Sequence, residues 1–373
     1  MSTSGRLPGP TYVFDKYGDQ YVAVPGSPNQ ASVSPSTDFA TLFSRVMANL
    51  VDGDIIDGKG LVFVVTTKLN VTKNITVRNF KFVVQGASGP TFILEWNTTG
   101  LSYQDRILNV SFIVEQAVGT SGLLITNHNV IIIESCFFNG TSTGGAKGID
   151  KTNTPFCDVV NCVLLNWDTG IRSLGKIRVL NCKTNVAVTG VVLSTVNASD
   201  SQIIGGEHIG TTWAIQIATA ENCLVMGVRH QASVAFLPSK RSRFIGNHAV
   251  DSTSGLFLDN SANVGVVVIG NVFMRNIDNS VLAPKDSVFI GNVLIGTGGL
   301  FSTGLLPDVS NIIAFNGEGA EAREFHQNVK VSASTPTTSD IQQNSSRVWK
   351  NTTDGTVKLY YNDAGILKSV TLA

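Results

Sequence analysis

The sequence contains little charge, and the charge it has is balanced. Of its 373 residues, 14% are Asp, Glu, Lys or Arg, and the formal net charge is zero. Proteins that bind nucleic acid through its phosphates present a basic stripe, which this composition does not supply. We therefore expect no nucleic-acid partner.

Long apolar runs are also missing. No stretch approaches the ~20 apolar residues that a membrane-spanning helix needs. No apolar run follows a basic start at the N-terminus, as it would in a secretory signal. The five cysteines are odd in number and include no Cys-x-x-Cys pair, which disfavours both a disulfide framework and a zinc site. We expect no membrane insertion, no metal and no cofactor.

The chain does contain a repeat, in which a β-branched apolar run is followed by Gly or Asn. The clearest copies are residues 244–247, 268–271 and 289–292, and degenerate copies lie upstream. The reference positions are Ser135, Asn161, Asn181, Gly206, Val228, Asn247, Asn271 and Asn292, which span 157 residues in seven steps, a mean of about 22. A period of this length, without helical or Leu-x-x-Leu-x-Leu spacing, predicts a stacked solenoid of strands.

The predicted fold class is all-β, a right-handed single-stranded parallel β-helix. β-Branched residues suit its half-buried strands, and Gly and Asn suit its corners because they tolerate positive φ. Cys136, Cys162 and Cys182 each follow a reference position by one residue. We interpret them as an inward ladder of small hydrophobic side chains.

Composition divides the chain into five parts. Residues 1–35 are rich in Gly, Pro and Ser and predict an extended arm, although they carry several aromatic residues. Residues 36–60 predict a capping helix, with Ser36 or Thr37 as N-cap, and the entry to the β-helix. The β-helix covers 61–320, and a linker covers 321–335. Residues 336–373 predict a three-stranded β-meander with strands at 347–350, 357–361 and 366–370, too small to stand alone.

Three segments together resemble the tailspikes and tail fibres of bacteriophages that carry a pectate-lyase-like parallel β-helix. They are the helix and first rung in 36–60, the irregular rungs of 61–320, and the ending at 346–360. The resemblance implies a homotrimer that attaches to phage tail or virion proteins through residues 1–35. It also implies a host surface polysaccharide as ligand, and a location in the virion tail after synthesis in the host cytoplasm.

Polysaccharide hydrolysis needs two carboxylates, roughly 5–5.5 Å apart for retention or 6.5–9.5 Å apart for inversion. The sequence shows no matched pair on neighbouring rungs, and no Asp cluster of the kind that binds calcium. Asp and Asn at corners are usually turn residues. The catalytic residues are therefore unknown, with Asp168 and Glu207 as single candidates.

One group of polar residues falls at equivalent places on neighbouring rungs. Glu207, Arg229 and His248 form one expected ladder, and Lys183, His208 and His230 form its neighbour. The first ladder shares its position with the inward cysteines, so either the register slips after Cys182 or that position faces outward. The group is either a hydrogen-bonded stack in a subunit seam or a ligand-binding patch.

Tryptophan is the second indication of carbohydrate binding, since an indole offers a flat apolar face. Trp167 and Trp213 follow their reference positions by six and seven residues, so similar corners should carry them, and Asp168 lies beside Trp167. Both indoles could instead pack under a loop or a neighbouring subunit. These features favour a spike that binds a host glycan, with a polysaccharide depolymerase (glycoside hydrolase or lyase) and a purely structural virion component as alternatives.

Overall fold

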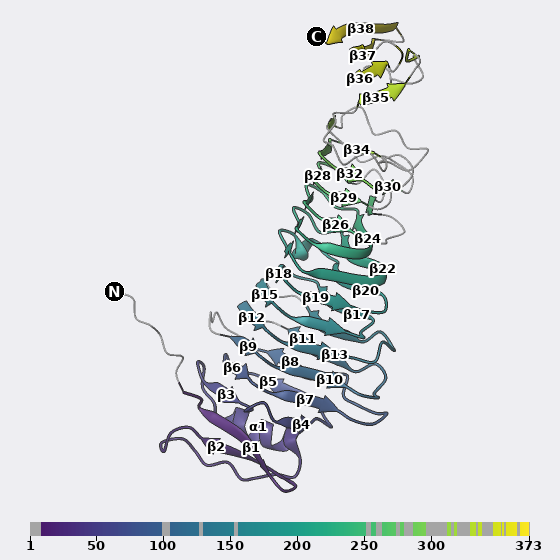
Figure 1. Ribbon diagram of the computed structural model, residues 1–373. Helices are drawn as coiled ribbons and strands as arrows, with labels where there is room; N and C mark the ends of the chain where they lie inside the picture. Colours follow the sequence, from purple (N-terminus) through teal and green to yellow (C-terminus); the bar gives the residue numbers. More distant parts are fainter. Residues whose placement is uncertain are drawn as a thin grey trace, which may run out of the picture.

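The chain forms a column of short parallel strands stacked along one axis (Figure 1). The computed structural model describes residues 9–98, 105–126, 130–152 and 156–250, and then the segments 255–258, 263–273, 277–279, 286–295, 312–314, 317–318, 329–332, 335–337, 346–351, 353, 356–363 and 366–372. The architecture is an all-β parallel solenoid with very little helix, as the repeat predicts.

One face of the column is a 14-stranded sheet, which we call face A. After an initial hairpin its strands are parallel, and each pairs with the strand one turn earlier. In spatial order they are β2 (Gln20–Pro25), β1 (Tyr12–Tyr17), β3 (Ile55–Asp57), β6 (Thr76–Arg78), β9 (Arg106–Leu108), β12 (Val130–Glu134), β15 (Phe156–Val160), β18 (Ile177–Leu180), β21 (Gln202–Ile204), β23 (Leu224–Met226), β25 (Arg243–Ile245), β28 (Val267–Ile269), β31 (Val288–Ile290) and β33 (Ile312–Ala314).

The 20-stranded second sheet supplies two further faces. Face B contains β4 (Val62–Val64), β7 (Lys81–Val84), β10 (Ser111–Val114), β13 (Phe137–Asn139), β16 (Val163–Leu165), β19 (Lys183–Asn185), β26 (His248–Ala249), β29 (Val272–Phe273), β32 (Val293–Leu294) and β34 (Gly317–Glu318). Face C contains β5 (Leu69–Val71), β8 (Phe92–Asn97), β11 (Ser121–Thr126), β14 (Lys147–Lys151), β17 (Thr169–Ser173), β20 (Thr189–Leu193), β27 (Leu256–Leu258) and β30 (Ile277–Asn279). The long strands β22 (Glu207–Ala218) and β24 (Arg229–Leu237) run through both faces.

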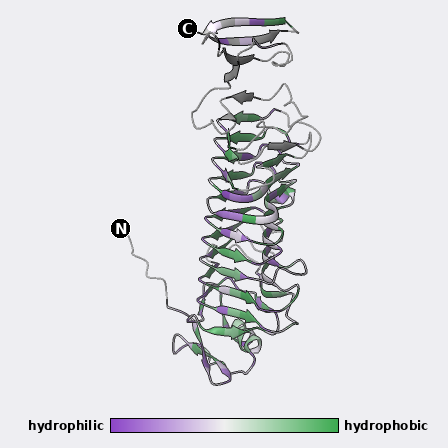
Figure 2. Ribbon diagram, turned by 45° about the vertical axis from the view of Figure 1, so that its right-hand side comes forward, coloured by the Kyte–Doolittle hydropathy of each residue, from purple (hydrophilic) through white to green (hydrophobic). Residues whose placement is uncertain are grey.

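Side chains alternate between the interior of the column and its surface, as strand geometry requires. In β12, Ile131 and Ile133 are buried, while Ile132 and Glu134 are partly exposed. Figure 2 shows the resulting mixture of hydrophobic and hydrophilic residues along the strands. Cys136, Cys162 and Cys182 are buried in the core, as predicted, and Cys157 and Cys223 are buried as well.

The N-terminal arm is not extended, and this prediction was wrong for the described residues from 9 onward. Strands β1 and β2 form an antiparallel hairpin, and β1 continues face A by pairing parallel with β3. The aromatic residues drive this docking, because Phe14 is fully buried with its ring centroid 5.7 Å from that of Phe39 and 5.2 Å from that of Phe80.

The predicted helix is present as α1 (Phe39–Asn49), and its buried side joins the core beside β2 and β5. Its N-cap is Asp38, not Ser36 or Thr37, and the Asp38 carboxylate accepts a 2.8 Å hydrogen bond from the backbone N–H of Thr41. Within the described residues no helix is long and apolar enough to span a membrane.

A separate four-stranded sheet contains the C-terminal strands β36 (Ser346–Asn351), β37 (Val357–Asp363) and β38 (Ile366–Leu372). These three are antiparallel, which is the meander that the sequence predicts. The fourth strand, β35 (Val329–Ser332), pairs parallel with β36, so part of the predicted linker is a strand.

Candidate functional site

The corners between faces A and B define the true register of the repeat. One residue per turn has left-handed backbone with φ between 50° and 64°, and these residues are Ser135, Asn161, Asn181, Gly205, Gly227, Gly246, Gly270 and Gly291. The predicted reference positions coincide with the first three and then lie one residue too late. In a Gly-Asn pair both residues tolerate positive φ, and the structure places the glycine at the corner and the asparagine in the core.

This one-residue slip resolves the conflict between the cysteines and the charged ladder. Cys182 lies one residue after its corner, whereas Glu207 lies two residues after Gly205, so the two occupy opposite faces of the sheet. The pairing register joins Lys183, Glu207, Arg229 and His248 on the outer surface of face B, which we call the charged ladder. Glu207, Arg229 and His248 were predicted to align, but Lys183 had been assigned to the neighbouring ladder.

Glu207 is held between two cations in the charged ladder. Lys183 Nζ lies 2.8 Å from one carboxylate oxygen, and Arg229 Nη1 lies 2.6 Å from the other. The hydrogen bond from Lys183 lowers the pKa of Glu207. A general acid that works near neutral pH needs a raised pKa, so this geometry argues against a catalytic role for Glu207.

The two histidines of the group face the interior and form no surface patch. Thr184, His208 and His230 occupy successive places in the core, and both histidine side chains are fully buried. His208 Nδ1 lies 3.1 Å from Thr184 Oγ1, and His230 Nδ1–H donates to the carbonyl oxygen of Ala232 over 2.9 Å. Burial lowers the pKa of each histidine to about 4.

Trp167 is a core residue, so its predicted role as a sugar platform was wrong. Its side chain is fully buried, and its indole fills the space beside two glycines. A Cβ added to Gly140 would lie 2.6 Å from atoms of that ring, and one added to Gly148 would lie 3.3 Å from it. Asp168 closes the adjacent loop, because its carboxylate accepts a hydrogen bond from the backbone N–H of Gly145.

Trp213 is partly exposed on the surface of face C. The ring beside it belongs to Phe257, whereas Trp167 lies in the core. The Trp213 ring centroid lies 5.4 Å from that of Phe257, with an interplanar angle of 40°. Ala235 lies at the register position between Gln216 and Phe257 and is fully buried. Gln216, three residues along β22, is partly exposed beside the two rings. We call Trp213, Gln216 and Phe257 the aromatic patch.

The sequence did not indicate Phe257 or Gln216. Once the corners are corrected, Gln216, Ala235 and Phe257 fall at one position on three successive turns. A small residue between two larger ones leaves a place where a ring can lie across the sheet. That alternation in size would have identified the patch, but it cannot be recognised in a misaligned repeat.

Several carboxylates of the described region are paired with cations. Asp150 accepts two hydrogen bonds of 2.8 Å from Arg172, and Asp158 accepts bonds of 2.8 and 2.7 Å from Arg178. The described residues contain no group of three or more His, Cys, Asp or Glu side chains placed to hold a metal ion.

Comparisons with known proteins identify the fold. No protein-family model matches the chain, and no curated protein matches it by sequence. Among solved structures it is similar to the A-module of mannuronan C-5 epimerase AlgE6 from Azotobacter vinelandii, with a TM-score of 0.50 and 14% identity over 72% of this chain and 84% of that one. The AlgE4 A-module from the same organism gives a TM-score of 0.51 and 11% identity over 74% and 91%. At these identities the likeness shows the fold alone, which is a parallel β-helix.

Proposed function

We propose that the protein is a subunit of a phage tailspike or tail fibre that binds a polysaccharide of the host surface through the aromatic patch. The observation that carries this proposal is the pair of rings, Trp213 and Phe257, on the outer surface of face C. Aromatic rings offer flat apolar surfaces to a ligand, and Gln216 beside them can donate and accept hydrogen bonds to hydroxyls. The names of the two similar structures, both epimerases of the polysaccharide mannuronan, support the ligand class.

Binding without cleavage is the version that the charges favour. Glycoside hydrolysis requires one carboxylic acid with a raised pKa and a second carboxylate close to it. Asp150, three turns from Gln216 on face C, is nearly fully buried and ion-paired with Arg172. Glu207, at the face B end of the strand that carries Trp213, is ion-paired on both oxygens. The lowered pKa of Glu207 makes it a poor proton donor at neutral pH.

The same proposal includes a homotrimer that packs through face A. Its outward residues Val160, Leu180, Ile204, Met226, Ile245, Ile269 and Ile290 are aligned one above another on successive strands. All seven are at least partly exposed, Met226 by 37%. With strands ~4.8 Å apart, this aliphatic ladder extends about 29 Å. An apolar stripe of this length is typical of a surface that a partner covers.

Attachment to the particle is assigned to the N-terminal region, as the resemblance implies. In the hairpin the surface that stays available includes Tyr17 and Val24, which are 65% and 46% exposed. The proposed location is the virion tail.

A right-handed sense is expected for the column, because crossovers between parallel strands are right-handed in nearly all proteins.

The experiment that tests this function combines binding and product sizing. The purified protein is incubated with surface polysaccharide from candidate hosts, and retention and chain length are measured together. We expect retention without shortening. Shortened chains would establish the depolymerase instead, and neither effect on any host polysaccharide would favour a structural virion component.

The role of the patch is tested by Trp213→Ala, which removes one ring. We expect affinity for the retained polysaccharide to fall at least about tenfold, equivalent to ~1.4 kcal/mol of lost contact. Phe137→Ala is the matched control, because it removes a partly exposed ring from face B and should leave affinity unchanged. Equal affinity of folded Trp213→Ala and wild-type protein would contradict the proposal.

A further inference from the structure

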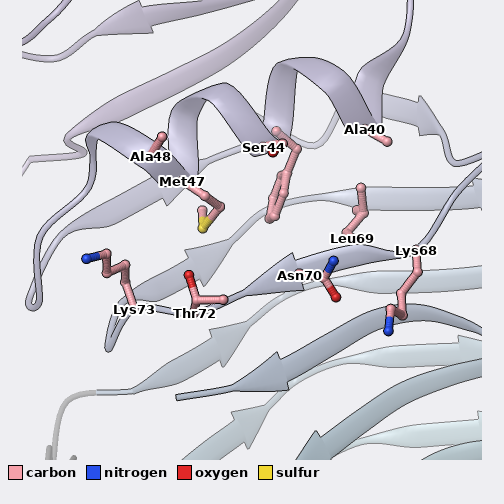
Figure 3. Close-up of a pocket in the computed structure, with 10 residues that line it drawn as sticks. Ala40, Ser44, Met47, Ala48, Lys68, Leu69, Asn70, Thr72 and Lys73 are labelled. Atoms are coloured by element: carbon pink, nitrogen blue, oxygen red, sulfur yellow. The ribbon is translucent and has the colours of Figure 1, made fainter. Parts of the chain in front are cut away.

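A groove lies far along the column from the aromatic patch, between helix α1 and strand β5 (Figure 3). Its volume of about 370 Å³ is at the small end of the range for ligand sites. On the helix side it is bordered by Ala40, Ser44 and Ala48, which are spaced four residues apart and so share one side of the helix. Because these three side chains are small, the helix leaves an open groove above the strand.

The groove has an apolar floor and polar ends. Phe43, Met47 and Leu69 form the buried floor, and Asn70 and Thr72 present an exposed amide and an exposed hydroxyl. Figure 3 shows Lys68 and Lys73 at opposite ends, below the helix. Hydroxyl and amide groups beside a small apolar surface suit a sugar ring, which has an apolar face and hydroxyls at its rim.

The two lysines differ in their pairing. Lys68 forms an ion pair with Glu95 on the next turn, so its charge is already compensated. Among the described residues Lys73 has no ion-pair partner, and none of the ten residues that line the groove is acidic. The groove therefore has an uncompensated positive charge at the Lys73 end. An ammonium group there would bind a carboxylate by a charge-assisted hydrogen bond.

We propose that this groove binds a carboxylated sugar, a hexuronic acid unit of an acidic polysaccharide. The carboxylate lies against Lys73, the ring covers Met47 and Leu69, and the hydroxyls reach Thr72, Asn70 and the Lys68–Glu95 pair. The site is separate from the aromatic patch and would give an acidic polysaccharide a second contact on the same subunit. It does not depend on attachment of the protein to a virion.

The test is direct titration of the full-length protein with trigalacturonate, followed by calorimetry or by NMR of the Met47 methyl group. The neutral galactose trimer and acetate are titrated in parallel. We expect trigalacturonate to bind at least about tenfold more tightly than either, because neither combines the sugar rings with a carboxylate. Equal affinity for the neutral trimer, equal affinity for acetate, or no binding of trigalacturonate would each overturn the proposal.

Two variants locate the site, and two others serve as controls. Lys73→Gln should weaken trigalacturonate binding at least about tenfold, and Ser44→Phe should abolish it by filling the groove. Lys81→Gln, which neutralises a partly exposed lysine on face B, is the control and should bind as the wild type does. Trp213→Ala should also keep this binding, so loss at the aromatic patch and loss at this groove are distinguishable. If Lys73→Gln and folded Ser44→Phe both bind normally, the ligand lies elsewhere and the assignment is wrong.

Discussion

Trp167 and Trp213 show how one residue type serves two purposes in this fold. They follow their corners, Asn161 and Gly205, by six and eight residues, so they emerge at different places on their turns. Trp167 turns into the column and packs on Gly140 and Gly148, whereas Trp213 is partly exposed beside Phe257. The residue type alone indicates neither outcome, because an indole satisfies a core and a binding surface equally well.

At the same scale, His208 and His230 predict a pH dependence of stability. Both are buried, and burial lowers their pKa values from 6.5 to about 4. Between these pH values the unfolded chain binds more protons than the folded one, so the free energy of unfolding falls as the pH is lowered from about 6.5 toward 4. Each pKa unit of difference corresponds to about 1.4 kcal/mol for each histidine.

The measurement is thermal unfolding between pH 7 and pH 4. His208→Leu removes one buried titrating group, so the loss of stability across this window should be smaller than in the wild type. His248→Gln is the control, since His248 is exposed in the charged ladder and the wild-type slope should persist. A His208→Leu profile parallel to the wild type would show that His208 does not titrate on unfolding.

At the scale of elements, the core changes its composition along the column. The position after the corner is occupied by Cys136, Cys162 and Cys182 in the middle turns and by Asn247, Asn271 and Asn292 in later ones. The asparagines form a buried hydrogen-bonded chain in which Asn247 Nδ2 donates to Asn271 Oδ1 over 3.0 Å. Asn271 Nδ2 in turn donates to Asn292 Oδ1 over 2.9 Å. Each of these amides also donates a hydrogen bond to a backbone carbonyl of the preceding turn.

Replacing the middle amide should break this chain in both directions. Asn271 Oδ1 also accepts from the backbone N–H of Asn247, and its Nδ2 donates to the carbonyl of Phe244. Asn271→Ala leaves the buried backbone N–H of Asn247 without its acceptor, at about 1–3 kcal/mol, and removes the other bonds of the Asn271 amide. Chemical denaturation should show this loss, while Asn185→Ala on the exposed surface of β19 should change stability by less than ~0.5 kcal/mol. Equal effects of the two would mean that the ladder is not structural.

The N-terminal hairpin supplies another prediction for a single element. Phe14 is enclosed by Phe39, Phe43, Phe63 and Phe80, so Phe14→Ala should lower the unfolding free energy by about 3–5 kcal/mol. Tyr17 lies on the same strand but is 65% exposed, and Tyr17→Ala should change stability little. If an extended arm existed in solution, neither substitution would affect thermal unfolding.

The parts of the fold that could be predicted from the sequence are the repeated turns, because the chain contains many copies of them. A solenoid repeats the same corner, so degenerate turns still average to the correct period. The register was lost where Gly205-Gly206 and the later Gly-Asn pairs offered two residues that tolerate positive φ. The hairpin was overlooked although Gly18-Asp19 joins two alternating strands, because proline and glycine on either side suggested an arm. The contact between Trp213 and Phe257 depends on the register of the repeat, so it could not be predicted until that register was correct.

At the scale of the whole molecule, the three faces of the column differ in the side chains that they present to solvent. Face A has the aliphatic ladder, face B has the charged ladder, and face C has the aromatic patch. If the column were monomeric, seven aliphatic side chains would remain in water along one side. If three columns pack through face A, those side chains leave water while the charged ladder and the aromatic patch stay accessible. This division of roles is the physical reason for assigning assembly to face A and binding to face C.

The assembly is tested by placing charge in the aliphatic ladder. Ile204 and Met226 are directly paired on neighbouring strands, so the double variant Ile204→Lys, Met226→Lys puts two like charges at its centre. Burying unpaired ammonium groups between subunits costs several kcal/mol each, which should convert a trimer to monomers at micromolar concentration. Light scattering measures the mass, and circular dichroism checks that the column remains folded, since both residues face outward.

The control is the double variant Ile113→Lys, Leu165→Lys, which places the same charge at partly exposed positions of face B and should leave the trimer intact. A trimer that survives the face A variant would move the interface to another surface, and a wild-type protein that is monomeric by light scattering would refute the trimer itself.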